Sequence, residues 1–300
     1  MTLLLFQNFV PLAFLIALGY AIGKWHKVDL KSVATLAIYG ITPLVAFGSA
    51  AQLDFSFSLL LLPVCTFFLA AAVGMGTFWA GKFVTSDRPR YLLPVACGSG
   101  NTGYFGLPVA MALFGDQVAG IYFVANLGVV VFETSIGFYY MARGNLSRED
   151  AIKRVLGLPV LYALAAGLVF AAAHLSLPAP AIKLWEISKG AYIVVGMMIA
   201  GLALAGMTNF SLKPKLLALA LAGKFALWPL AALIFAAFDP GLFDAQVHQL
   251  ILVMSLTPIP ANLPAYAAAN DGPVAEAALL VFVSTLLALI FMPVLLPHLL

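Results

Sequence analysis

Residues 97–108 read Cys97-Gly-Ser-Gly-Asn-Thr-Gly-Tyr-Phe-Gly-Leu-Pro108, which places four glycines and a proline inside a long apolar run. In a helix interior, glycine costs about 1 kcal/mol and proline about 3 kcal/mol relative to alanine. The run is otherwise long and apolar enough to form one helix. We therefore expect that helix to be interrupted within this stretch.

A second stretch has the same character. Residues 257–264 read Thr257-Pro-Ile-Pro-Ala-Asn-Leu-Pro264, and each of the three prolines removes one backbone donor. Pro108 and Pro264 each suit the first turn of a new helix, with Gly106 or Asn262 just ahead as its cap. The residues predicted to break or hinge the two helices are Gly98, Gly100, Gly106, Pro108, Pro258, Pro260 and Pro264.

The composition assigns the chain to the membrane. Hydrophobic residues make up 63% of its 300 residues, charged residues only 9%, and the mean hydropathy is +1.06. A water-facing fold needs more polar surface than this. A soluble enzyme, a nucleic-acid-binding protein and a disordered scaffold are therefore excluded, and we predict an all-α membrane protein in contact with the lipid bilayer.

Ten apolar segments are long enough to cross a bilayer as helices, which takes roughly 20 residues each. The first is predicted to be a span and not a cleaved signal peptide, because Met1–Val10 contains no Lys or Arg. The predicted transmembrane helices are 3–23, 32–52, 57–80, 91–115, 118–142, 157–175, 185–207, 214–237, 248–270 and 276–298.

The basic residues predict the orientation. Twelve of the fifteen Lys and Arg residues lie in the connections between spans 1 and 2, 3 and 4, 5 and 6, and 7 and 8. Basic loops stay in the cytoplasm. We expect a multi-pass protein of the cell inner membrane with both termini on the extracytoplasmic side.

Three pairs of segments match in the same order along the chain. Pro11–Gly19 resembles Pro159–Gly167, Gly106-Leu-Pro108 resembles Asn262-Leu-Pro264, and Val131–Thr134 resembles Val281–Ser284. The offsets of 148, 156 and 150 residues predict two five-helix repeats. These are 1–142 and 157–300, joined by a cytoplasmic linker at 143–156. Because five is odd, the second repeat is inverted, an arrangement common among transporters.

Interrupted helices at membrane depth must line protein or a wet cavity, because lipid offers their free backbone groups no partners. Two helix N-termini near the midplane would favour a bound anion. The alternative is that the glycines and prolines only kink the helices for close packing. The candidate substrate-binding residues are Asn101, Thr102, Gly103, Tyr104, Thr257, Asn262, Tyr266 and Lys224.

Few ionisable residues fall inside the predicted spans, where such residues are usually functional, and Lys224 and Glu133 are the two candidates. Lys224 is expected to attract the anion or to pair with a carboxylate, with a structural ion pair as the alternative. Glu133 is a candidate to carry a proton, unless it lies near enough to the cytoplasmic interface to stay solvated. The His and Cys residues form no metal-ligand pattern. We expect no cofactor, with H⁺ or Na⁺ as a coupling ion.

Several strings resemble a known family. Asn101-Thr-Gly-Tyr-Phe-Gly-Leu-Pro-Val-Ala110, Pro264–Asn270 and Lys224-Phe-Ala-Leu-Trp-Pro229 are similar to the auxin efflux carrier family. The resemblance implies ten spans in two inverted repeats, with helices 4 and 9 crossing at their breaks. It also implies a scaffold domain, a transport domain and a homodimer. Substrates in this family are small organic anions, auxin in plants and dicarboxylates such as malonate or malate in bacteria. The bile-acid sodium symporters share the fold.

We therefore expect a secondary carrier, a symporter or uniporter, that moves a small organic anion by alternating access. The alternatives are a sodium-coupled carrier like the bile-acid symporters, and a channel or receptor without carrier activity. An intramembrane enzyme is disfavoured, because the sequence contains no nucleophile–base pair or metal set.

Overall fold

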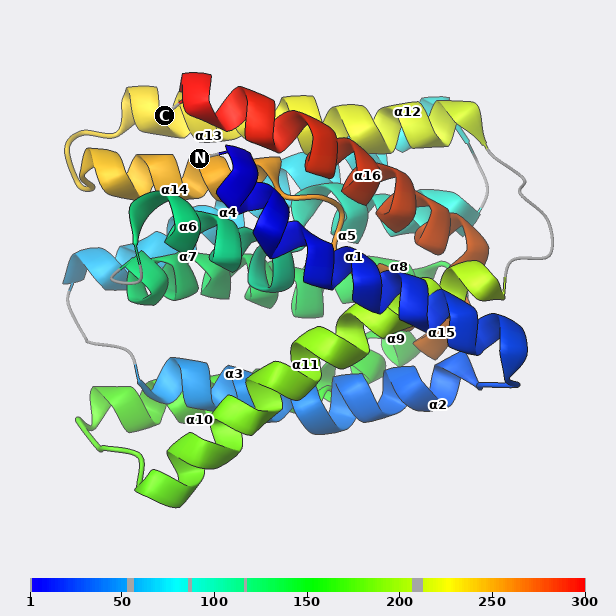
Figure 1. Cartoon of the computed structure of the whole chain (residues 1–300), viewed down its shortest axis with the longest axis horizontal. Coiled ribbons are helices and arrows are strands. Elements are labelled where there is room, and N and C mark those ends of the chain that lie inside the picture. The colour runs from blue at the N-terminus through cyan, green and yellow to red at the C-terminus, as the bar shows by residue number, and fades with distance from the viewer. Residues whose placement is uncertain (1, 53–56, 86–87, 116–117, 207–212, 300) are drawn as a thin grey trace.

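The computed structural model describes residues 2–52, 57–85, 88–115, 118–206 and 213–299, and these ranges contain helices and no strand (Figure 1). Segments labelled η are 3₁₀ or π turns. In chain order the elements are α1 (Thr2–Trp25), α2 (Leu30–Thr35), η1 (Leu36–Ile41), α3 (Thr42–Ala51), α4 (Phe57–Ala80), η2 (Gly81–Phe83), η3 (Arg88–Leu92), α5 (Leu93–Gly98), η4 (Thr102–Gly106), α6 (Leu107–Phe114), α7 (Ala119–Phe132), η6 (Glu133–Gly137), α8 (Phe138–Arg143), α9 (Arg148–Leu156), α10 (Pro159–Ala172), α11 (Ala179–Ala205), α12 (Pro214–Ala222), η7 (Gly223–Leu227), α13 (Trp228–Phe238), α14 (Ala245–Leu256), α15 (Leu263–Ala269) and α16 (Val274–Leu299).

Six continuous helical stretches in the described residues are long and apolar enough to cross a membrane. A seventh is added if the pair α9 and α10, bent by 46°, counts as one span. The six are Leu30–Ala51, Leu61–Phe83, Gly120–Arg143, Ala179–Ala205, Pro214–Phe238 and Val274–Leu296. The predicted all-α membrane class is confirmed. Two of the other predicted spans, 91–115 and 248–270, are interrupted helices and so do not pass as single spans.

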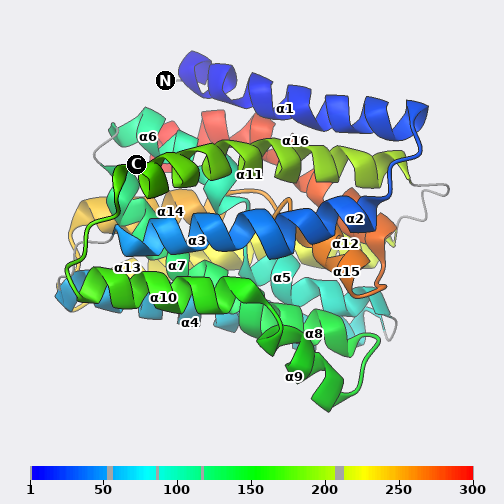
Figure 2. The ribbon, with the colours of Figure 1, turned by 90° about the horizontal axis from the view of Figure 1, so that it is seen from below.

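The helices form two groups. We call α1, α2–α3, α10 and α11 the panel, because α1 packs on α11 and α3 packs on α10. Figure 2 shows α11, α2–α3 and α10 in front of the other helices, with α1 along the top. We call α4–α8 and α12–α16 the core group, in which α4 packs on α5 and α7, and α13 packs on α14.

Glycines allow the closest of these contacts. A side chain at Gly19 would come within 2.8 Å of the Met198 Cα atom, and one at Gly201 within 2.6 Å of the Tyr20 amide nitrogen. Both contacts join α1 to α11. Since no side chain stands between them, the two helices approach backbone to backbone.

π-Turns let three prolines lie inside continuous helices. The turns η1, η4 and η7 end two residues before Pro43, Pro108 and Pro229. A proline lacks an N–H and its ring collides with the carbonyl four residues back. A wider turn at that point accommodates both defects without ending the helix.

This accommodation corrects one prediction. The helix after the first interruption begins at Thr102, not at Pro108, and runs through Gly106 and Pro108 to Phe114. Gly106 and Pro108 are therefore not break residues. The predicted linker 143–156 also contains a helix, α9, whose cap is Ser147: its Oγ accepts a hydrogen bond from the Asp150 amide at 3.1 Å.

Candidate functional site

The first interruption consists of Ser99–Asn101, between α5 and η4. Polar groups in this segment and at the end of α5 beside it are paired with residues of other helices. The Trp228 indole donates to the Gly98 carbonyl at 3.0 Å, and the Asn101 amide donates to the Pro258 carbonyl at 2.8 Å. The Ser99 hydroxyl donates to the Glu133 carboxylate. The short segment is thus held open by partners outside its own helix.

The second interruption consists of Thr257–Asn262, between α14 and α15. Pro258 and Pro260 lie within it, and Pro264 occupies the first turn of α15 with Asn262 at the cap position. The Asn262 side chain does not cap that helix. The Ile259 amide donates to the Ser284 hydroxyl of α16 at 3.1 Å. This segment is therefore anchored to the last helix of the core group.

The two interruptions touch each other at Gly100. A Cβ atom at Gly100 would lie 2.6 Å from Lys224 Nζ and in collision with the Thr257 hydroxyl. Only glycine lets these three residues meet. Lys224 is 1% exposed, and its Nζ lies 5.5 Å from the centre of the Trp228 ring.

A cavity of about 120 Å³ opens beside the junction, between the panel and the core group. The panel contributes residues of α3 and α11, and the core group contributes both interruptions, α7, η6 and α15. Six of the eight predicted substrate-binding residues line it: Asn101, Thr102, Gly103, Tyr104, Asn262 and Tyr266. Thr257 and Lys224 are not among the lining residues, because they pack against Gly100 instead.

Two tyrosine hydroxyls are hydrogen-bonded to Asn262 in one wall of the cavity. The Tyr104 hydroxyl donates to Asn262 Oδ1 at 3.4 Å, and Asn262 Nδ2 donates to the Tyr192 hydroxyl at 3.2 Å. The Tyr104 and Tyr192 rings lie 4.3 Å apart. Asn262 therefore links η4 in the core group to α11 in the panel.

Asn101 differs from Asn262 in its hydrogen bonding. Its side chain is 3% exposed, and within the described residues its Oδ1 atom has no hydrogen-bond partner. Buried polar atoms are nearly always paired, so an unpaired acceptor in a cavity wall calls for a ligand or a water molecule. Nearby, the Thr102 hydroxyl is already engaged with Asn126.

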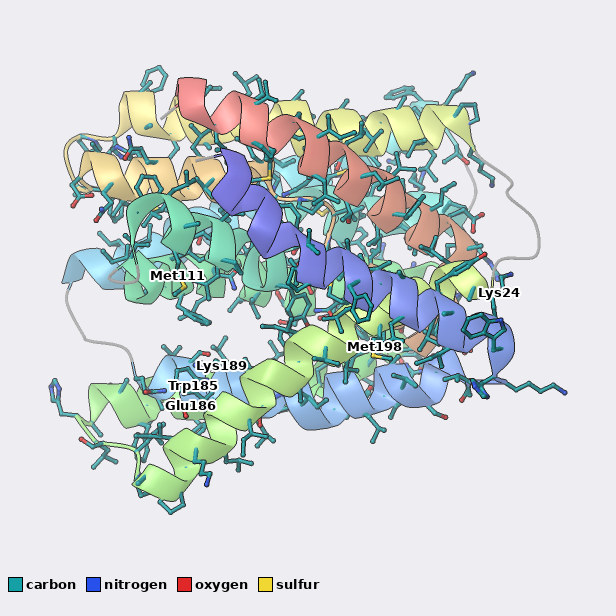
Figure 3. All side chains as sticks on the ribbon, in the orientation of Figure 1. Lys24, Met111, Trp185, Glu186, Lys189 and Met198 are labelled. Carbon is teal, nitrogen blue, oxygen red and sulfur yellow. The ribbon has the colours of Figure 1, made fainter. Side chains whose placement is uncertain are left out.

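The cavity is charged at two places. Glu133, 6% exposed, begins the π-turn η6 and lines the cavity, with the Tyr266 and Asn262 side chains also facing its carboxylate. Glu133 is therefore part of the site, not a solvated residue near the interface. Lys189 of α11 also lines the cavity (Figure 3).

Sequence reasoning missed three of these residues: Lys189, Asn126 and Tyr192. Lys189 could have been found from the sequence, because it falls inside the predicted span 185–207, where a charged residue is rare. Asn126 and Tyr192 lie on regular helices, and nothing in the sequence says which face of those helices turns to the cavity.

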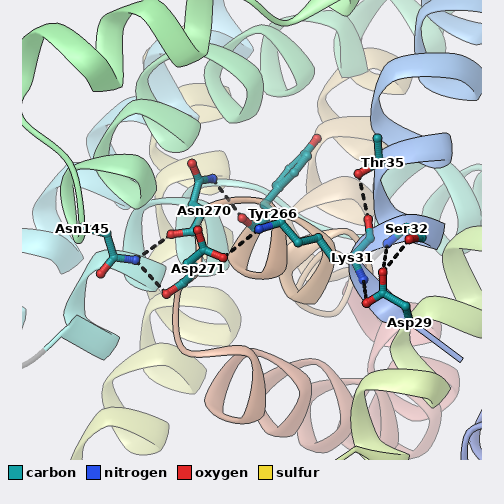
Figure 4. Close-up of polar contacts among 8 residues, drawn as sticks. All are labelled: Asp29, Lys31, Ser32, Thr35, Asn145, Tyr266, Asn270 and Asp271. Carbon is teal, nitrogen blue, oxygen red and sulfur yellow. Dashed lines mark hydrogen bonds and ion pairs between the residues drawn. The ribbon is translucent and has the colours of Figure 1, made fainter. Parts of the chain in front are cut away.

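Polar contacts join the panel to the core group at one end of the bundle (Figure 4). Lys31 Nζ lies 2.8 Å from Asp271 Oδ1, and Asn145 Nδ2 donates to the carbonyls of Asn270 and Asp271 at 2.6 and 2.9 Å. The hydrogen bond from Lys31 lowers the pKa of the Asp271 carboxyl. We call this group the clasp. It joins the start of α2 to the segment after α15.

The clasp lies where basic connections gather. Arg88 and Lys213 line a surface hollow together with Asp271 and Glu276. The C-terminal ends of α1, α4, α8, α11 and α15 thus lie at one end of the bundle, at the right of Figure 1. We call it the basic end.

Two comparisons bear on identity. The model of the sodium bile acid symporter family matches residues 190–300. An uncharacterized transporter of Methanothermobacter thermautotrophicus is 27% identical over 166 residues, which cover 52% of this chain and 54% of that protein. The chain thus spans about half the length of the curated relative it matches. Both matches fit the superfamily of bile-acid and auxin transporters, and neither is specific to auxin efflux carriers. The chain is similar to membrane transporters of this superfamily.

Proposed function

We propose that the protein is a secondary carrier for a small organic anion, a carboxylate, which binds in the cavity between the panel and the core group. One observation carries the proposal: the cavity forms where two interrupted helices meet and contains a buried, unpaired polar atom on Asn101. The helix Thr102–Phe114 also begins there, and a helix N-terminus favours negative charge.

The size of the cavity limits the substrate. A protein cavity of about 150 Å³ holds a benzene molecule, and this one is about 120 Å³. At this size the cavity encloses about five or six heavy atoms of a carboxylate, and a longer acid would extend through its open side. A steroid such as a bile acid is several times too large to be enclosed. The match to the sodium bile acid symporter family therefore supports transport as the function, but it does not support a bile acid as the substrate.

The position of the cavity supports alternating access. Its panel residues come from 42–49, in the half of the continuous helix Leu30–Ala51 farther from Lys31, and from 189–193, in the middle of α11. The closed clasp and this lining support a conformation open toward the end opposite the basic end. Movement of the core group against the panel would release the clasp and expose the substrate to the other side.

The same geometry supports ten crossings in two inverted repeats, with the interrupted helices as spans 4 and 9. All five odd-numbered connections then lie at the basic end, which the positive-inside rule places in the cytoplasm. Both termini would be extracytoplasmic in the inner membrane. A periplasm-specific reporter fused to the C-terminus should be active, and a cytoplasmic reporter should not.

Coupling to a cation follows from Glu133. An organic anion in the cavity would face this carboxylate, and two like charges in a water-poor site repel strongly. A proton on Glu133 or a Na⁺ ion entering with the substrate would remove the repulsion. Uptake driven by a pH gradient without sodium, and lost in Glu133→Gln, identifies the proton. Uptake that requires sodium at constant pH identifies Na⁺.

Lys224 keeps its predicted role in charge coupling at the junction, although it does not line the cavity. Lys224→Met should abolish uptake while leaving substrate binding measurable. Binding and uptake lost together would instead return Lys224 to the substrate site. The homodimer implied by the family resemblance is tested by light scattering of the detergent-solubilised protein.

The decisive experiment uses the full chain in proteoliposomes. A thermal-shift screen of two- to six-carbon carboxylates, with and without Na⁺ and across pH, selects the substrate, and counterflow then measures exchange. Saturable uptake with counterflow supports a carrier. Rapid, linear flux would make the protein a channel, and binding without flux would make it a receptor.

A further inference from the structure

Three lysines lie outside the basic connections: Lys183, Lys189 and Lys224. Lys183 is exposed near the start of α11 and does not line the cavity. Lys224 is buried against Gly100 and does not line it either. Among the described residues, the cation that lines the cavity is Lys189.

The ammonium group of Lys189 lies over the face of the Trp185 ring, and the fold fixes the position of that ring. Its Nζ lies 3.4 Å from the centre of the Trp185 ring, one helical turn earlier on α11. Figure 3 labels both residues where α11 faces α3. The Trp185 indole donates to the Ser49 hydroxyl at 3.3 Å, and a side chain at Gly48 would come within 2.9 Å of the Trp185 Cβ atom. The ring is therefore held against α3 at a fixed place.

A cation over an aromatic face is held more weakly than a cation paired with a carboxylate. The Trp185 ring can thus keep Lys189 in place in an empty cavity, together with the attraction of the exposed Glu186 carboxylate, without the hydrogen-bonded ion pair that an anion would offer. Its stem of four methylenes gives the ammonium group the reach to change partners.

At its other charged residue, Glu133, the cavity favours a hydrogen-bond donor and disfavours an anion. Glu133 lines it with a carboxylate, and Asn101 presents an unpaired acceptor oxygen. A second carboxylate on the substrate would meet these acceptors, whereas a hydroxyl or amino group would donate to them.

We propose that Lys189 is the residue that pairs with the substrate carboxylate, and that the substrate is a short monocarboxylate with a hydrogen-bond donor at its far end. Trp185 holds the lysine when the cavity is empty. This inference rests on the proposed carrier function and narrows its substrate class. It separates this chain from the dicarboxylate carriers that the family resemblance implies.

The test compares four variants with wild type in detergent and in proteoliposomes. Lys189→Gln removes the charge, Lys189→Arg keeps it, Trp185→Phe removes the hydrogen bond to Ser49, and Lys183→Gln is the matched control on the same helix. The probes are lactate, 3-hydroxybutyrate, propionate, butyrate, malonate and succinate. Binding is measured by thermal shift and transport by counterflow.

We expect the hydroxy acids to bind more tightly than the matched unsubstituted acids and the dicarboxylates. Lys189→Gln should weaken their binding by about tenfold or more, since a charge-assisted pair is lost. Lys189→Arg should stay within about threefold of wild type, and Lys183→Gln should not change it. Ligand should also change tryptophan fluorescence in wild type, and this change should be absent in Trp185→Phe and in Lys189→Gln.

The test distinguishes failure of the proposed carrier function from failure of this inference alone. If none of the six probes binds or is exchanged, the proposed function fails with the inference. If probes are exchanged and Lys189→Gln binds them as wild type does, or if dicarboxylates bind best, only the inference is overturned. Should Lys189→Gln not fold, wild type carries the test: lactamide, which lacks the charge of lactate, must bind about tenfold more weakly, and equal binding refutes the proposal.

Discussion

The two interruptions solve the same problem by different chemistry. At membrane depth an unpaired backbone donor is costly. The segment Thr257–Asn262 removes two of its donors by using Pro258 and Pro260, and pairs the Ile259 amide with Ser284. The segment Ser99–Asn101 contains no proline and keeps its donors: the Ser99 amide bonds to the Val95 carbonyl of α5, and the Asn101 amide bonds to the Pro258 carbonyl. One interruption therefore omits two of its donors, whereas the other keeps its donors and depends on acceptors in its own helix and in the other interruption.

The asparagines of the two interruptions also differ in their hydrogen bonds. Asn262 is tied to two tyrosine hydroxyls, whereas the Asn101 side-chain oxygen is unpaired within the described residues. The second asparagine therefore holds the architecture together, and the first is available to a ligand.

The largest effect should come from Gly100, where the interruptions touch. Gly100→Ala places a methyl group against Thr257 and Lys224, and overpacking of this kind costs about 1–3 kcal/mol. We expect a thermal midpoint several degrees below wild type. The matched control is Gly103→Ala, whose added methyl group meets no heavy atom within 4 Å. Equal midpoints for the two variants would contradict the contact.

Asn262→Ala should come next. It leaves the Tyr104 and Tyr192 hydroxyls without their shared partner, and losing buried hydrogen bonds costs about 1–3 kcal/mol. The thermal midpoint should fall and binding of the selected carboxylate should weaken together. A midpoint equal to that of wild type would mean that the two hydroxyls find other partners.

Asn101→Ala should separate binding from stability. Because its Oδ1 atom is unpaired without a ligand, its removal should leave the midpoint within about 1 °C of wild type. The dissociation constant should rise by about three- to tenfold, the usual range for one hydrogen bond. A large loss of stability with unchanged affinity would reverse the roles assigned to the two asparagines.

Ser284→Ala tests the backbone donor that the second interruption pairs with α16. Loss of its bond to the Ile259 amide should cost about 1 kcal/mol. Thr285→Val, on the next residue of α16, is the control, because the Thr285 hydroxyl has no partner within the described residues. If Thr285→Val lowers the midpoint as much as Ser284→Ala, the effect belongs to α16 and not to the interruption.

Release of the clasp should have the smallest effect on stability, because Lys31 and Asp271 are exposed. Lys31→Met should make a cysteine placed at Ala269 react faster with a maleimide. Since Lys31 lowers the pKa of Asp271, the pair contributes above the usual carboxyl pKa and is lost as the pH falls through the lowered value. Wild type should therefore approach the variant only in strong acid. Equal rates at neutral pH would mean that the clasp does not close this end.

Much of the fold could be predicted from local pattern. The apolar runs predicted at 57–80 and 214–237 correspond to α4 and to the helix Pro214–Phe238 almost residue for residue. The interruptions near Gly100 and Pro260, the cap position of Asn262 and the shared end of the basic connections also follow from composition. Each of these depends only on neighbours in the sequence, on propensity and on the hydrophobicity of a continuous run.

Only the tertiary structure decided how the helices turn toward each other. Pro108 reads as a break, but a π-turn whose width local propensity does not encode keeps it inside a helix. Lys224 reads as the substrate cation, but packing directs it at Gly100 and leaves Lys189 to line the cavity. The direction of a side chain from a helix depends on which distant helices surround it, and those contacts exist only once the panel and the core group have come together.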